Sequence, residues 1–256
     1  MDYRVSLLGF IVGLLIGLTG MGGGALMTPA LILLKLARPT LAVGTDLVWN
    51  ALTKAVGSLV HLRQSTVDTT IVKRLAAGSI PGALGGLALL ACLQHRGVKG
   101  EDRLISWILG VALIAVALSL FVRSLLGARL PLPGQEGLSR GPVWLTTAVG
   151  AAVGFLVSIT SVGSGSLIVA SLVFIYPTTA LKRLVGSDIF HALFLVGVAA
   201  IGHLGLGSIN TKLLLGLLIG SVPGVWIGSR LTVVLPEKLF RPVLGTTLLY
   251  LGLKLL

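Results

Sequence analysis

The sequence predicts an all-α integral membrane protein with about eight hydrophobic segments in two pseudo-symmetric repeats. Three observations lead to this prediction. The 256 residues are 55% hydrophobic and 11% charged, with a mean hydropathy of +1.02, so polar side chains are too few to cover a water-exposed surface. Apolar runs long enough to cross a bilayer recur along the chain. Motifs of the first half return in the second, which is typical of secondary transporters built from internal repeats.

The repeat is clearest where residues 43–86 align with residues 185–228 without a gap, with 13 of 44 positions identical. The offset between the two stretches is 142 residues. Three motifs occur in both: Gly-(Thr/Ser)-Asp ending at Asp46 and Asp188, His-Leu beginning at His61 and His203, and Gly-Ser-x-Pro-Gly around Pro81 and Pro223. At an offset of 141, the stretch 19–24 matches the stretch 160–165.

Each half is therefore expected to contain four elements in the same order. The first is an apolar segment interrupted by glycines; the N-terminal run Val5–Leu18 lacks a cleavage site and is expected to stay in the mature protein. The second is a helix that starts with Gly-(Thr/Ser)-Asp and ends with His-Leu. The third contains Gly-Ser-x-Pro-Gly, and the fourth is a plain apolar helix. The further apolar runs are 42–62, 75–93, 104–122, 143–159, 184–206, 213–235 and 239–256.

These elements are expected to form a single transmembrane domain over residues 1–256. Repeat one covers 1–122, a polar linker covers 123–142, and repeat two covers 143–256. The first unit of each half either crosses the membrane once as a broken helix or enters and returns. The distribution of Lys and Arg weakly favours the returning arrangement, in which the two halves are inverted relative to each other.

Each first unit contains a stretch that should interrupt its helix. The stretches comprise Gly22, Gly23 and Gly24 in the first half, and Gly163, Ser164, Gly165 and Ser166 in the second. Broken helices at membrane depth persist only where they are buried in protein or line a polar cavity. The helices that follow would direct their positive N-termini into that cavity, which suits an anion. Close helix packing is the alternative, and we favour it for Gly9, Gly13 and Gly17, which are spaced by four.

A polar stripe follows in the next helix. Asp46, Asn50 and Lys54 are spaced by four and share one helix face, and His61 follows on the same side. Ionisable groups inside a membrane face the protein interior and commonly mark a transport pathway. Lys54 has valine as its repeat counterpart, at Val196. It could contact an anion or pair with Asp46 through a water molecule, and both interpretations remain open.

The repeated acids and histidines also have two interpretations each. Asp46 and Asp188 could cap helix N-termini, or they could carry a proton. His61 and His203 could be interfacial hydrogen-bonding groups or proton relays. His191, three residues after Asp188, is a further relay candidate.

Several functions are disfavoured by the sequence. The single cysteine, Cys92, allows neither an internal disulfide nor a cysteine-based metal site. No phosphate-binding loop or dinucleotide motif is present, so no cofactor is predicted. The net charge of +12 lies mostly in short loops, where it suits anionic lipid headgroups better than nucleic acid. An intramembrane enzyme would need a nucleophile and base that the spacing of the serines and histidines does not indicate.

At these motifs the chain resembles the sulfite exporter TauE/SafE family of membrane transporters. The matching residues are Gly20 to Gly24 followed by Pro29, Ala42 to Thr45, and their recurrence at Gly163 to Gly165 and Val185 to Ser187. The resemblance implies a multi-pass carrier in the cell inner membrane for small sulfur-containing anions such as sulfite, sulfoacetate or other organosulfonates. Serines replace glycines at Ser161 and Ser164, and no proline maps to Pro29 in the second half.

Together these features predict secondary-active transport, with export as the expected direction. The interrupted stretches would donate hydrogen bonds to the anion, Asn50 and Lys54 would add orientation and charge, and Thr45 and Ser187 would be secondary donors. Protons are the expected coupling ion. A passive anion channel is the closest alternative function. The identity of the anion and the oligomeric state, including a homo-oligomer, are left open.

Overall fold

The structure, a computed structural model, describes residues 3–19, 24–97, 100–126, 141–231 and 237–256. Within these ranges all regular secondary structure is helical, which confirms the all-α prediction. The helices are α1 (Tyr3–Thr19), α2 (Gly24–Leu33), α3 (Pro39–Arg63), α4 (Thr69–His95), α5 (Glu101–Leu126), α6 (Val143–Thr160), α7 (Ser166–Ile175), α8 (Leu181–Gly205), α9 (Thr211–Leu231) and α10 (Glu237–Leu255).

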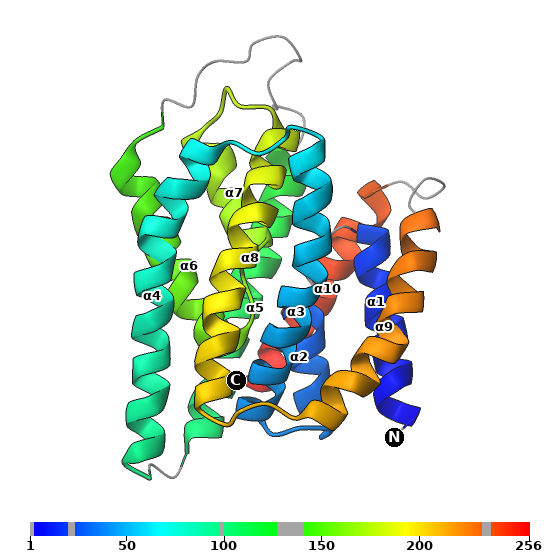
Figure 1. The fold of residues 1–256 in the computed structure, drawn as a ribbon. Helices are drawn as coiled ribbons and strands as arrows, with labels where there is room; N and C mark the ends of the chain where they lie inside the picture. The colour runs from blue at the N-terminus through cyan, green and yellow to red at the C-terminus, as the bar shows by residue number, and fades with distance from the viewer. Residues whose placement is uncertain (1–2, 20–23, 98–99, 127–140, 232–236) are drawn as a thin grey trace.

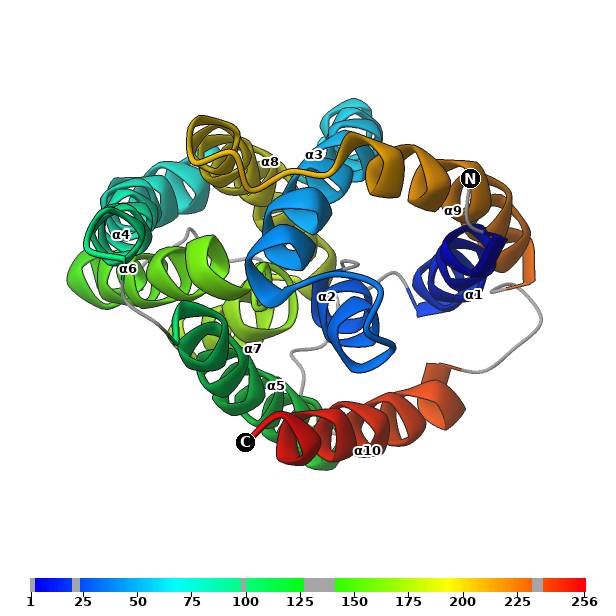
Figure 2. The same cartoon turned by 90° about the horizontal axis from the view of Figure 1, so that it is seen from below.

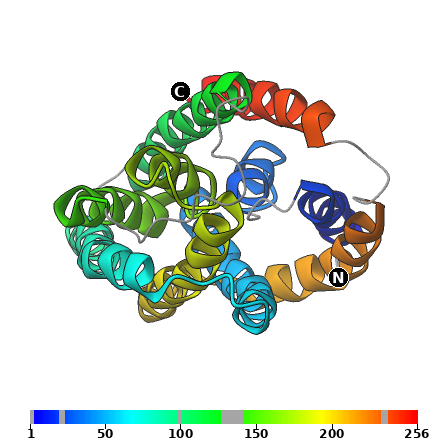
Figure 3. The same cartoon turned by 90° about the horizontal axis from the view of Figure 1, so that it is seen from above.

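The short helices α2 and α7 follow the two predicted interruptions, and each returns toward the end where its unit began (Figure 1). The return is clear in the second half, where Thr146 in the first turn of α6 bonds to Tyr176 just after α7, with an Oγ1 to hydroxyl distance of 2.8 Å. Viewed along the bundle, α2 and α7 lie inside a ring of longer helices (Figures 2 and 3). The fold thus places both short helices in the protein interior.

Helix α3 starts earlier than predicted, and so does α8. The sequence places their first residues at the Gly-(Thr/Ser)-Asp motifs, whereas the helices begin at Pro39 and Leu181. For α3 the reason is local, since proline at the first helical position has a preset φ angle and no amide hydrogen to satisfy. Asp46 and Asp188 therefore lie about two turns inside their helices, and the capping interpretation of these two acids is wrong.

Glycines bring helices from opposite halves into close contact. Gly9 and Gly13 of α1 face the backbone of α9, where a Cβ would lie against Leu217 and Ser221. The matching positions of the second half behave alike: Gly150 and Gly154 of α6 face Leu75 and Ser79 of α4. Because glycine has no side chain, it lets two helix backbones approach directly. The packing interpretation of Gly9 and Gly13 is confirmed.

Matching helices of the two halves run in opposite directions. In Figure 1, α3 rises from the end where the N-terminus lies, whereas α8 descends toward it. Helix α5 likewise rises and α10 descends. Gly110 of α5 and Gly252 of α10, which are equivalent at the offset of 142, face each other's carbonyl oxygens.

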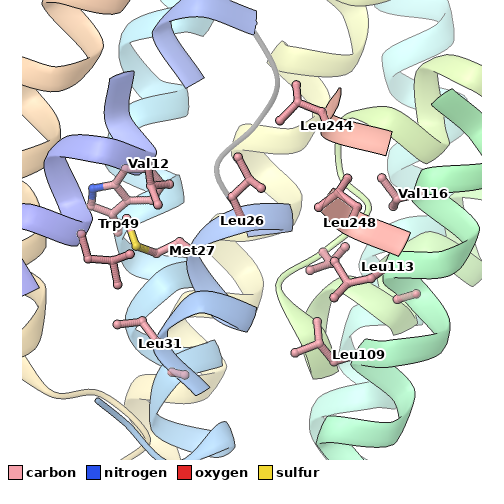
Figure 4. Packing of buried hydrophobic residues seen from close by; sticks show 14 of the residues in the cluster. Val12, Leu26, Met27, Leu31, Trp49, Leu109, Leu113, Val116, Leu244 and Leu248 are labelled. Carbon is pink, nitrogen blue, oxygen red and sulfur yellow. The ribbon is translucent and has the colours of Figure 1, made fainter. Parts of the chain in front are cut away.

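Two apolar clusters hold the bundle together, each around one short helix. The first includes Leu26, Met27 and Leu31 of α2, which pack with side chains of α1, α3, α5 and α10 (Figure 4). The second includes Ile168 and Leu172 of α7, packed with α3, α4, α6 and α8. Many large apolar side chains remain exposed on the outside, as expected where lipid replaces water.

Five of the described helices are long and apolar enough to cross a membrane. They are α4, the part of α5 from Glu101 to Val122, α6, α8, and the part of α9 from Thr211 to Gly228. These helices support a multi-pass helical protein, whereas the number of about eight hydrophobic segments stays a prediction.

Two neighbouring glycines of α4 test the close packing. Gly82→Ala would place a Cβ against the Ala151 backbone, whereas Gly85→Ala meets its nearest neighbour, a ring carbon of Phe155, at 4.0 Å. We expect Gly82→Ala to destabilise the protein by about 1 to 3 kcal/mol through overpacking. Gly85→Ala should stabilise it by up to about 1 kcal/mol, because alanine favours a helix over glycine. Thermal unfolding in detergent measures both changes, and equal effects would contradict this account of the α4 and α6 contact.

Candidate functional site

The start of α2 meets the interruption of the second half in the interior. Helix α6 ends at Thr160, the next residue Ser161 has a left-handed φ of 62°, and Gly163 follows with φ 113°. The α-carbon of Gly24, the first residue of α2, lies so close to the Ser161 carbonyl that a Cβ there would overlap it. Gly22 and Gly23 lie outside the described residues. The start of α2 therefore packs directly against the interruption in the second half.

A small cavity of about 20 Å³ lies at this meeting point. Its lining consists of Gly24, Ala25, Ser161, Gly163, Ser164, Gly165 and Ser166. These residues include the first turn of α2 and the first residue of α7, so the N-termini of two helices share one cavity. The residue before α7, Gly165, offers no side chain to cap the helix, which leaves first-turn amides available to a ligand. A cavity of this size holds about one water molecule, so an oxyanion would need the two helix starts to separate.

A chain of buried hydrogen bonds runs from α2 through α3 to this cavity. The Thr28 hydroxyl donates to Asp46 Oδ2 at 2.6 Å. Asn50 Nδ2 donates to Asp46 Oδ1 at 3.2 Å and lies 3.4 Å from Ser161 Oγ. Asn50 Oδ1 is buried and has no hydrogen-bond partner in the described part of the chain. Because buried polar atoms are nearly always paired, this amide is an unusual feature of the cavity wall.

Lys54 belongs to a second polar group, between α3 and α8. Its side chain is 7% exposed, and the charge that acts on it favourably is that of Asp188. The same ammonium acts electrostatically on His191. Lys54 thus interacts with an acid of the other half, and this arrangement does not support a pair with Asp46.

His191 takes the place of a tryptophan in the first half. Trp49, which is equivalent at the offset of 142, donates its indole N–H to Ser221 Oγ at 2.8 Å. His191 Nε2 makes the corresponding contact with Ser79 Oγ at 2.7 Å. Its other ring nitrogen, Nδ1, is buried without a hydrogen-bond partner among the described residues. The two halves are therefore alike in scaffold and different in chemistry.

Thr45 and Ser187 lie away from the cavity and anchor loops. Thr45 Oγ1 accepts from the Asn210 amide at 3.1 Å, before α9. Ser187 Oγ accepts from the Asp68 amide at 2.8 Å, before α4. Adjacent Gly44 and Gly186 allow the same loops to approach. The repeated glycine and hydroxyl of the Gly-(Thr/Ser)-Asp motif thus hold loops, while the acid points into the bundle.

The histidines near the ends of α3 and α8 have different surroundings. His61 is partly exposed, and its Nδ1 lies 2.9 Å from Thr66 Oγ1. His203 is fully buried and its Nε2 donates to the Ser158 carbonyl at 2.8 Å. The hydrogen bonds of these two histidines in the described structure go to Thr66 and Ser158, which do not line the cavity.

Two residues of this site were not singled out from sequence. Thr28 holds Asp46, and Ser79 holds His191. Ser161 was noted as a departure from the glycine pattern, but its position opposite Gly24 follows from tertiary packing. The one sequence signal that could have identified Thr28 as a site residue was its hydroxyl within a short apolar helix.

Comparisons with known proteins give one family model and several probable membrane transporter proteins. The family model described as sulfite exporter TauE/SafE matches residues 5–255. A probable membrane transporter protein, YjnA of Bacillus subtilis, is 40% identical over 261 residues, which covers 100% of each chain. YdhB, also a probable membrane transporter protein of Bacillus subtilis, is 24% identical over 98% of this chain and 99% of its own. No solved structure gives a significant match.

Proposed function

We propose that this chain, a multi-pass membrane protein that belongs to the sulfite exporter TauE/SafE family, transports a small sulfur-containing anion such as sulfite or an organosulfonate by a secondary-active mechanism. The family supports a membrane transporter rather than an enzyme. The choice of anion, its export and its coupling to protons are our proposals. We place the protein in the cell inner membrane, where such carriers use ion gradients.

The observation that carries this proposal is the cavity shared by the starts of α2 and α7. Two helix N-termini direct partial positive charge and free amide hydrogens at one point. Ser164, Ser166 and Asn50 add hydroxyl and amide donors around it. Because hydrogen bonds to an ionised oxygen are stronger than neutral ones, this lining suits a compact oxyanion.

Alternating access would follow from the relation between the halves. Matching helices run in opposite directions (Figure 1), and matching glycines make matching contacts. We infer from these features that the two repeats are inverted. In carriers with inverted repeats, one repeat rocks against the other around a site near the middle of the membrane. The small volume of the cavity corresponds to a closed conformation of such a cycle.

Transport by purified protein in liposomes tests the proposal. We expect saturable counterflow of labelled sulfite, with competition by some members of a panel of sulfite, sulfoacetate, thiosulfate and sulfate. A carrier binds its substrate in each cycle, so flux should saturate and no single-channel current should appear. Flux that rises in proportion to anion concentration, with unitary currents, would instead identify a passive channel. Absence of any anion flux would overturn the proposal.

A further inference from the structure

Asp46 is a buried acid next to the anion cavity, linked to its lining by Asn50 and by Ser161. Asp46 is fully buried and bonds to Asn50, which also reaches Ser161 Oγ in the cavity lining. An ionised carboxylate there would repel an anion held by the same lining, and a low-dielectric interior screens that repulsion poorly. The anion and an ionised Asp46 therefore compete for the same donors.

The charged groups around Asp46 do not remove this conflict. Helix α2 supplies the Thr28 hydroxyl, and α9 meets α3 through Ser221 and Trp49. At the start of α3, Asp102 of α5 bonds to Thr40. The remaining buried ionisable groups on α3 and α8 are Lys54, Asp188, His191 and His203.

Lys54 is engaged by the acid of the other half. Its ammonium interacts with Asp188 and acts on His191, and His203 donates to the Ser158 carbonyl. Asp188 therefore has a cationic partner, whereas the partners observed for Asp46 are the neutral side chains of Thr28, Asn50 and Ser161. By charge alone, an incoming anion would disfavour the ionised form of Asp46 more than that of Asp188.

Resting on the proposed function, we propose that Asp46 binds a proton whenever the anion occupies the cavity, so that the protein moves one proton with each anion. The proton comes from water on the side of entry, forms an O–H bond with the Asp46 carboxylate, and returns to water on the other side. Its charge offsets that of the anion, and because the two move together, export by this route is driven by an outward gradient of the anion.

The Asn50 amide supplies the link between the two events. With Asp46 ionised, Asn50 Nδ2 donates to it, and Asn50 Oδ1 is left without a partner in the described structure. With Asp46 protonated, a half-turn of the amide lets the new O–H donate to Oδ1. The NH₂ group then turns to the cavity, where it can donate to the anion. The amide thus satisfies all its polar atoms only in the state that holds both proton and anion.

The ratio of protons to anions tests the inference in liposomes that contain a trapped pH dye and receive labelled anion. We expect the wild-type protein to carry one more proton per anion than Asp46→Asn, whichever anion of the panel is used. Asp102→Asn, which changes a carboxyl group at the start of α5 outside the site, is the control and should keep the wild-type ratio. Equal ratios in wild type and Asp46→Asn would overturn the inference while leaving the transport function intact, whereas absent counterflow in the wild type would count against the function itself.

A second measurement needs no variant. Anion binding to the wild-type protein should take up one proton, so affinity should fall about tenfold for each unit of rising pH once Asp46 ionises in the empty protein. Calorimetry of sulfoacetate or sulfite binding in two buffers of different ionisation enthalpy counts that proton, after correction for the anion's own ionisation. Binding without proton uptake would contradict the inference, even if Asp46→Asn fails to fold.

Discussion

Gly24→Ala should strongly reduce transport. The new Cβ would overlap the Ser161 carbonyl oxygen and lie 3.0 Å from Asn50 Nδ2. The first neighbour is backbone and the second is a hydrogen-bonded side chain, so neither moves aside easily. The start of α2 must therefore move away from the interruption between α6 and α7. A displacement of about 1 Å in a binding site can cost on the order of a hundredfold in rate. We expect counterflow of labelled sulfite to fall by about that factor.

A matched control separates this effect from a general intolerance of helical glycine replacement. Gly197 of α8 has no neighbouring atom within 4 Å of an added Cβ, so Gly197→Ala should transport as well as the wild type. Size-exclusion chromatography in detergent shows whether each variant is folded. Normal counterflow by a folded Gly24→Ala protein would mean that the contact between the interruptions is not needed for transport.

Lys54→Met should cause the largest loss of stability among the polar substitutions. Removing the ammonium leaves Asp188 as a buried charge without its cationic partner. Breaking a buried ion pair from one side costs about 3 to 5 kcal/mol. Thermal unfolding in detergent should show a correspondingly lower midpoint for Lys54→Met.

The double variant distinguishes a pair from two independent contributions. Asp188→Asn together with Lys54→Met removes both charges, so its stability should lie above that of Lys54→Met alone. If the two single effects simply add, the two side chains are not coupled. Counterflow by the stable double variant then reports whether Lys54 has a role in transport besides neutralising Asp188, and wild-type rates would withdraw its proposed contact with the anion.

The sequence predicted the scaffold well because repeated glycines report backbone contacts. Gly9 and Gly13 were assigned to helix packing, and both lie against α9. The interruption between α6 and α7 was also predicted, since a run of glycine and serine cannot continue a membrane helix unaided.

Side-chain partners could not be predicted in the same way, because they depend on how distant helices cross. Asp46 and Asp188 occupy equivalent sequence positions, yet Thr28 and Asn50 bond to the first and Lys54 interacts with the second. Thr45 and Ser187 are hydroxyls beside these acids, and helix geometry turns them to the loops before α9 and α4. Their proposed role as secondary anion donors has no support in these contacts.

The position of a bound anion tests the central claim most directly. Selenite resembles sulfite in shape and charge, and its selenium atom can be located by anomalous diffraction from crystals grown with it. We predict one strong selenium peak between the N-termini of α2 and α7, within hydrogen-bonding distance of Ser164 or Ser166 and next to Gly24. A peak at another place in the bundle, with this cavity unchanged and empty, would contradict the account.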